Sequence, residues 1–190
     1  MSWILSVPEA GAGPALAPIY ERIRARSSNR RVANLWLALG HDPATLDATE
    51  TLYRSLVKQP GPLTPAQAEL IALVVSATNG CGYCVAHHGP ALAGALGSEA
   101  LARAVAMDYR SADLVARDRV LLDHCVALTC EPGERTAADI ERVREYGFDD
   151  AVIAKATAIA GYYSYVNRLV GSLGVKLEND VPAWEFGSQV

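Results

Sequence analysis

The stretch from Asp149 to about Leu173 most constrains the fold, because it reads as one long helix that is apolar on nearly every side. Its middle, AVIAKATAIAGYYSYV, contains a single charged residue, Lys155. A helix that is apolar all round has to be buried, so we expect it in the core or between subunits. No stretch elsewhere shows sustained alternation of apolar and polar residues, which strands would require. The sequence therefore predicts an all-α fold.

Cap and breaker signals divide the rest of the chain into further helices. Thr64-Pro65-Ala66-Gln67 has the form of a capping box with proline at the first helical position, which predicts a helix to about Thr78. Asn79-Gly80 interrupts it, and a second helix is expected from Cys81 to about Leu96, bent near Pro90. Other helices are expected at 14–27, from 41–43 onwards, 99–107, 112–128 and 136–146, and residues 32–39 form a short apolar segment.

Composition and charge bound the class of protein. Hydrophobic residues make up 51% of the chain and aromatic residues only 7%, which favours helices over strands. The chain of 190 residues fits one domain. We expect an N-terminal extension at 1–40, a core containing the cysteine motif at 41–130, and C-terminal helices with a tail at 131–190.

Partners and location follow from the same features. The net charge of -4 gives no basic face for nucleic acid or anionic membranes. The longest apolar run, Leu70 to Ala77, is too short to span a bilayer, and the N-terminus lacks a positive targeting region. We therefore expect a cytoplasmic protein. In a reducing compartment, closely spaced cysteines indicate a metal site or redox chemistry.

The segment ELIALVVSATNGCGYCVAHH, from Glu69 to His88, carries the chemistry. Cys81 and Cys84 form a CxxC pair at the start of a predicted helix, where free N–H groups and the helix dipole favour a thiolate. His87 and His88 follow Cys84 by three and four residues, so either imidazole can lie on the same face of the helix as Cys84. From there it can take the proton of the Cys84 thiol. Glu69 can orient the imidazole if it faces the cysteines across the Asn79-Gly80 bend.

This pattern resembles the AhpD-like, or carboxymuconolactone decarboxylase, superfamily. The matching residues are Glu69, Cys81, Cys84 and His88 within SATNGCGYCVAHH. Asn167-Arg168 and Gly174-Val175, within YSYVNRLVGSLGV, are similar to its peroxidase-related branch. The resemblance implies an AhpD-like multi-helix fold that assembles as a homo-oligomer. It also implies a thiol-dependent peroxidase acting on hydrogen peroxide or organic hydroperoxides, without a metal or organic cofactor.

The roles of the site residues also come from the resemblance. Cys84 would be the peroxidatic thiolate activated by His88, Cys81 the resolving thiol, and Glu69 part of the proton relay. A partner dithiol would reduce the resulting disulfide. Tyr83 stands where AhpD has a second histidine, and a phenol is a far weaker base at neutral pH. We therefore treat Tyr83 and His87 as accessory residues.

Several alternatives stay open. The CxxC pair, His88 and Glu69 could in principle hold zinc, although structural zinc sites usually have a second pair of ligands. The chain could instead be a lactone decarboxylase, a disulfide redox sensor, or an interaction protein with incidental cysteines. Cys125 and Cys130 are interpreted as buried packing residues, and Asn167-Arg168 as a pair that holds the last helix through buried hydrogen bonds.

Overall fold

Helices form all the regular secondary structure in the part of the chain that the computed structural model describes, residues 2–27 and 29–189. The α-helices are α1 (Ala17–Arg26), α2 (Asn34–Ala38), α3 (Pro43–Tyr53), α4 (Pro65–Thr78), α5 (Gly82–Leu96), α6 (Glu99–Asp108), α7 (Ala116–Cys130), α8 (Ala137–Glu145) and α9 (Asp150–Leu173). The 3-10 turns are η1 (Glu9–Gly11), η2 (Leu39–His41) and η4 (Pro132–Glu134), and η3 (Arg54–Lys58) is a π-helical turn. The expected domain limits at 1 and 190 fall outside the described residues.

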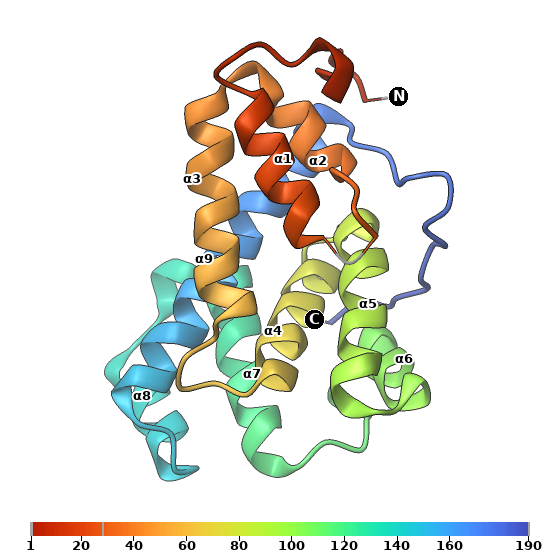
Figure 1. Ribbon diagram of the computed structural model, residues 1–190. Coiled ribbons are helices and arrows are strands. Elements are labelled where there is room, and N and C mark those ends of the chain that lie inside the picture. The colour runs from red at the N-terminus through yellow and green to blue at the C-terminus, as the bar shows by residue number, and fades with distance from the viewer. Residues whose placement is uncertain (1, 28, 190) are drawn as a thin grey trace.

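The two helices α4 and α9 lie at the centre of the core, to which the other helices also contribute. Helix α4 is buried at every position from Ala68 to Ala77 and packs against α5, α7 and α9 (Figure 1). Helix α9 packs against α4 and α7, as the apolar sequence predicts, although Tyr165 on its outer side is exposed. No helix in the described ranges has the length and apolar character needed to cross a membrane.

End signals in the sequence explain most helix limits. Thr64 and Gln67 form the predicted capping box of α4, in which each side chain bonds to the other residue's backbone N–H. Helix α5 begins after Cys81, continues through Pro90 and ends at Leu96, where Gly97 with positive φ is the C-cap. The expectation that a helix starts at Ala112 was wrong, because α7 begins at Ala116.

The late start of α7 has a visible cause. The Arg119 guanidinium donates hydrogen bonds to the carbonyl oxygens of Ala112 and Leu114, at 3.1 and 3.0 Å. Those carbonyls are therefore satisfied by a side chain while the segment stays non-helical, and Val115 precedes the first turn in an extended conformation. Nothing in the local periodicity of residues 112–128 indicates this arrangement.

The C-terminal tail covers α5 and α6. In Figure 1 it leaves the upper end of α9, runs down the right-hand side and returns behind α5. Trp184 lies against Gly89 of α5, and the Arg103 guanidinium covers its ring at 4.4 Å. The buried Gln189 side chain donates to the carbonyl oxygen of Ala106 and accepts from the backbone N–H of Tyr109. The tail is therefore docked through specific contacts.

We predict that Gly89→Ala will weaken this docking. A Cβ at position 89 would overlap the Trp184 indole, and the helical backbone at Gly89 cannot easily move away. Overpacking of this kind costs about 1–3 kcal/mol, which should appear as a lower free energy of unfolding in urea and a red shift of tryptophan fluorescence. Gly94→Ala is the matched control on the same helix: it meets no atom within 4 Å and should stabilise the protein by up to about 1 kcal/mol. Equal effects of the two variants would contradict the prediction.

Candidate active site

The CxxC pair lies at the turn that joins α4 to α5. Gly80 takes a positive φ of 68°, which a glycine adopts without strain, and lets the chain reverse between the two helices. Cys81 occupies the N-cap position of α5, and Cys84 lies in its first turn. Both thiols are free and buried, at 6% and 3% exposure, and their Sγ atoms are 2.9 Å apart. A disulfide needs about 2.05 Å, so only a small movement separates the two states.

The two thiols have opposite pKa shifts. The hydrogen bond between the two sulfurs lowers the pKa of Cys81, and backbone N–H groups at the start of α5 and the Asn167 side chain add to this effect against burial. The neighbouring Cys81 sulfur and burial raise the pKa of Cys84 well above its ordinary value. The sequence led us to expect the lowered pKa at Cys84. The structure instead favours the first negative charge of the pair at Cys81, because the hydrogen bond with Cys84 and the backbone N–H groups at the start of α5 stabilise its thiolate.

His88 contacts two side chains through its two ring nitrogens. Nδ1 lies 2.7 Å from Oε2 of Glu69, and Nε2 lies 2.8 Å from the hydroxyl of Tyr163. The expected contact between Glu69 and His88 is therefore present. Both ring nitrogens therefore have partners, and His88 is hydrogen-bonded to Tyr163 and not to Cys84. Tyr163 was missed in the sequence, because it lies on α9 and nothing in the local pattern connects it to His88.

Glu69 is a buried carboxylate, only 5% exposed, on an otherwise apolar helix. Its Oε1 accepts a hydrogen bond of 2.7 Å from Nζ of Lys58, which comes from the π-helical turn. Burial alone would raise the pKa of Glu69, but the charge and hydrogen bond of His88, followed by those of Lys58, lower it to about 2. Glu69 is therefore an ionised group held between Lys58 and His88, and Lys58 is a second site residue that the sequence did not reveal.

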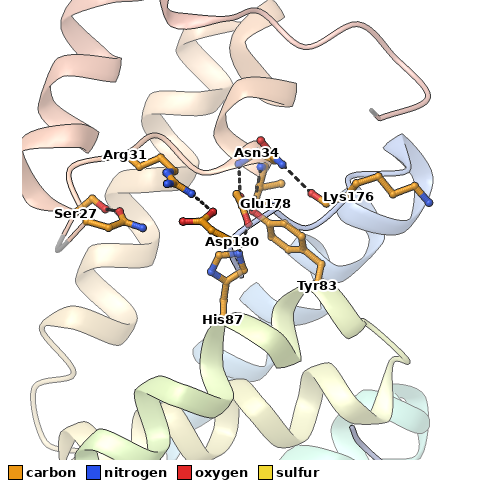
Figure 2. Close-up of polar contacts among 10 residues, drawn as sticks. Ser27, Arg31, Asn34, Tyr83, His87, Lys176, Glu178 and Asp180 are labelled. Atoms are coloured by element: carbon orange, nitrogen blue, oxygen red, sulfur yellow. Dashed lines mark hydrogen bonds and ion pairs between the residues drawn. The ribbon is translucent and has the colours of Figure 1, made fainter. Parts of the chain in front are cut away.

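Tyr83 and His87 belong to a separate network around Glu178 of the tail. Figure 2 shows Glu178 between the two rings and Asn34. The Tyr83 hydroxyl donates to Oε1 of Glu178 at 3.0 Å, the Asn34 backbone N–H donates to the same oxygen at 2.7 Å, and Nε2 of His87 lies 3.0 Å from Oε2. Burial opposes ionisation of Glu178, yet the hydrogen bonds from His87 and Asn34 lower its pKa to about 2. These accessory residues therefore tie the tail to α5.

A cavity of about 490 Å³ connects the two networks. Cys84 and His88 line it together with Tyr163, and Glu178 lines it from the tail. The pKa of Tyr163 is raised well above its ordinary value, chiefly by burial, so its hydroxyl keeps its proton and can act as a donor. The cavity therefore brings a thiol and a proton-donating phenol to one space.

The remaining residues that the sequence singled out lie as follows. Asn167 is buried, donates to the Ser76 hydroxyl at 3.1 Å and accepts from Asn79 at 3.0 Å, which holds α9 against α4 and the turn after it. Arg168 is exposed and does not share this role. Cys125 is fully buried, but the expectation that Cys130 is buried was wrong. Within the described ranges, no group of three or more His, Cys, Asp or Glu side chains is arranged to hold a metal ion.

Comparisons with known proteins agree on one family. Residues 43–123 match the carboxymuconolactone decarboxylase family. The crystal structure of an alkylhydroperoxidase AhpD core, peroxidase-related protein from Ralstonia eutropha JMP134 has 27% identity and a TM-score of 0.86, over 95% of this chain and 94% of that chain. A peroxidase-related protein from Silicibacter sp. TM1040 has 30% identity and a TM-score of 0.84, over 93% and 92%.

A more distant structure shares the fold alone. The debrominase Bmp8, solved in complex with 2,3,4-tribromopyrrole, has 16% identity and a TM-score of 0.76, over 92% of this chain and 90% of that chain. Among curated protein sequences, none matches the chain.

The lowered pKa of Glu69 generates a prediction about acid stability. The pKa is about 2 in the folded state, against an ordinary value of 4.5. The ionised group therefore stabilises the fold above about pH 4.5, and this contribution is lost as the pH falls towards 2. We expect the advantage of the wild type over Glu69→Gln, measured by urea unfolding, to shrink by up to about 3 kcal/mol across this window. Glu99→Gln, at an exposed position on α6, should show a constant difference, and a constant difference for Glu69→Gln would refute the prediction.

Proposed function

Because this chain belongs to the AhpD-like carboxymuconolactone decarboxylase superfamily, we propose that it is a thiol-dependent peroxidase that reduces hydrogen peroxide or organic hydroperoxides. The observation that carries the proposal is the pair of free thiols, 2.9 Å apart, of which Cys84 lines a cavity shared with a phenol–imidazole–carboxylate chain. The similarity to solved structures that are named peroxidase-related, at 27% and 30% identity, supports the same activity.

Cys84 is the attacking sulfur in the proposed reaction. It lines the cavity, whereas the resting charge is favoured at Cys81. The proton of Cys84 therefore first passes to Cys81 across the 2.9 Å contact between the sulfurs. The Cys84 thiolate then forms a bond to one peroxide oxygen as the O–O bond breaks. The sulfur is oxidised by two electrons to a sulfenic acid, and the other oxygen leaves as an alkoxide or hydroxide.

Tyr163 supplies the proton that the leaving oxygen needs. When His88 is doubly protonated, Nδ1 donates to Glu69 and Nε2 donates to the Tyr163 oxygen. The Tyr163 hydroxyl hydrogen is then free to point into the cavity and pass to the leaving oxygen, and Nε2 of His88 returns a proton to the phenolate. Lys58, which is partly exposed, connects Glu69 with solvent. His88 thus acts on the leaving group through Tyr163.

Cys81 completes the cycle. Its sulfur attacks the Cys84 sulfenic acid, the S–S bond forms as the S–O bond breaks, and the departing hydroxide takes the Cys81 proton to give water. A partner dithiol then reduces the disulfide by two exchange steps, in which the partner is oxidised; one of its two protons returns to the cysteine pair, and the other replaces the proton that His88 gave up. The short distance between the sulfurs supports a rapid resolving step.

The assignment of the two cysteines is tested by single substitutions. We expect Cys84→Ser to consume peroxide at the rate of the buffer alone. Cys81→Ser should accumulate a sulfenic acid at position 84 that dimedone traps and mass spectrometry locates. A trapped sulfenic acid at position 81 of Cys84→Ser would reverse the roles. A wild type that forms the disulfide but does not turn over with a dithiol would instead be a redox sensor.

The role of Tyr163 is tested by comparing two peroxides whose leaving groups differ in basicity. With cumene hydroperoxide, whose leaving alkoxide is strongly basic, we expect Tyr163→Phe to lower kcat/KM by about 100-fold, a common contribution of a general acid. With peracetic acid, whose leaving acetate is a weak base, the loss should be small. Tyr20→Phe removes another buried hydroxyl, one that donates to the Val7 carbonyl oxygen, and is the matched control. Equal losses with both peroxides would assign Tyr163 a structural role only.

A further inference from the structure

The cavity beside Cys84 is much larger than hydrogen peroxide requires. Its volume is about 490 Å³, whereas a water molecule occupies about 30 Å³ in the liquid. Volumes of about 300–1,000 Å³ are typical of sites for organic ligands. The space therefore fits a substrate with an organic body attached to the peroxide group.

An unbroken row of aromatic rings forms one wall of this cavity. Trp36 and Tyr53 have ring centroids 6.2 Å apart, Tyr53 and Tyr162 are 6.4 Å apart, and Tyr162 and Tyr163 meet edge to face at 5.3 Å. The row ends at the phenol that bonds to His88. Rings in such a row offer faces and edges to a flat apolar group. A substrate body lying along them would place its peroxide near Tyr163 and Cys84.

Within the described part of the chain, every arginine and lysine that lines the cavity has a carboxylate partner except Arg54. Arg26 pairs with Glu50 at 3.5 Å, Arg31 pairs with Asp180, and Lys58 pairs with Glu69. The Glu178 carboxylate has hydrogen-bond partners within the protein on both of its oxygens. Arg54 lines the same cavity, is only partly exposed and has no carboxylate partner among the residues that the structure describes.

Arg54 lies next to the row of aromatic rings. Arg54 begins the π-helical turn that directly follows Tyr53. Burial raises the pKa of Tyr53, and the positive charges of Lys58 and Arg54 partly offset that rise, so both cations act on this ring. A guanidinium binds a carboxylate through two parallel hydrogen bonds. Arg54 therefore stands next to the ring row with donors available for an anionic group.

From these observations we propose that the preferred substrate is an aromatic organic hydroperoxide that also bears a carboxylate, which Arg54 binds. The proposal rests on the peroxidase function and adds the class of substrate. The aromatic body lies along the ring row, the carboxylate pairs with Arg54, and the hydroperoxide reaches Cys84 and Tyr163. The reaction at sulfur is unchanged, and the product is the corresponding alcohol with its carboxylate intact.

Three matched substrates test the proposal: cumene hydroperoxide, its 4-carboxylate, and the methyl ester of that carboxylate. We expect the wild type to show a kcat/KM for the carboxylate at least about tenfold above that for the ester, because a hydrogen bond to a charged group contributes that much. In Arg54→Gln this ratio should fall towards one through a higher KM for the carboxylate. Arg24→Gln, which removes a surface arginine paired with Glu9, should keep the ratio. A wild-type ratio near one, or a ratio that survives in Arg54→Gln, would overturn the proposal.

Binding without turnover separates this proposal from the peroxidase function. In Cys84→Ser, which cannot react, 4-isopropylbenzoate should bind by calorimetry, and the added substitution Arg54→Gln should weaken this binding at least about tenfold. If binding depends on Arg54 but no hydroperoxide is reduced by the wild type, the peroxidase function fails and the anionic aromatic ligand stands. If hydroperoxides are reduced but the benzoate does not bind, the substrate class is wrong and the peroxidase function stands.

Discussion

The ionised carboxylate of Glu69 is the constraint on which the arrangement of the site depends. A buried charge costs several kcal/mol unless it is paired and hydrogen-bonded, and Glu69 lies on a helix whose other central residues are apolar. Lys58 and His88 satisfy its two oxygens from different elements, the π-helical turn and α5. Meeting this requirement fixes the π-helical turn, α4 and α5 relative to one another, and with them the side of the cavity on which His88 lies.

The same constraint divides the site into two halves, one with the two cysteines and the other with Glu69, His88 and Tyr163. Because Glu69 holds Nδ1 of His88, only Nε2 is available, and it points to Tyr163 on α9. The two thiols are organised separately, by the start of α5 and by Asn167, whose side chain helps to lower the pKa of Cys81 and partly opposes the rise in the pKa of Cys84. Helix α9 contributes Tyr163 to one half and Asn167 to the other. The long apolar helix that dominates the sequence therefore also aligns the nucleophile with the proton donor.

The sequence predicts those parts of the structure that depend on neighbouring residues. The capping box of α4, the break at Asn79-Gly80 and the helical spacing of Cys84 and His88 are local signals, and each has its counterpart in the structure. Tyr163 and Glu178 could not be predicted, because their contacts join segments distant in the chain. Lys58 could not be predicted either, because its contact with Glu69 depends on how the π-helical turn packs against α4. The start of α7 was also misplaced. The Arg119 side chain bonds to the carbonyl oxygens of Ala112 and Leu114 there, and the spacing of apolar residues gives no sign of such a contact.

The opposite pKa shifts of the two thiols are compatible with attack by Cys84. A thiolate of low pKa is abundant but weakly nucleophilic, and nucleophilicity rises with the pKa of the thiol. The lowered pKa of Cys81 favours a thiolate at this sulfur, and in the proposed reaction the transfer of one proton over 2.9 Å converts it into a more reactive anion at Cys84. The transfer also leaves Cys81 with the proton that the departing hydroxide needs when the disulfide forms. A single shared proton can therefore serve both the attacking and the resolving step, without an additional base next to either sulfur.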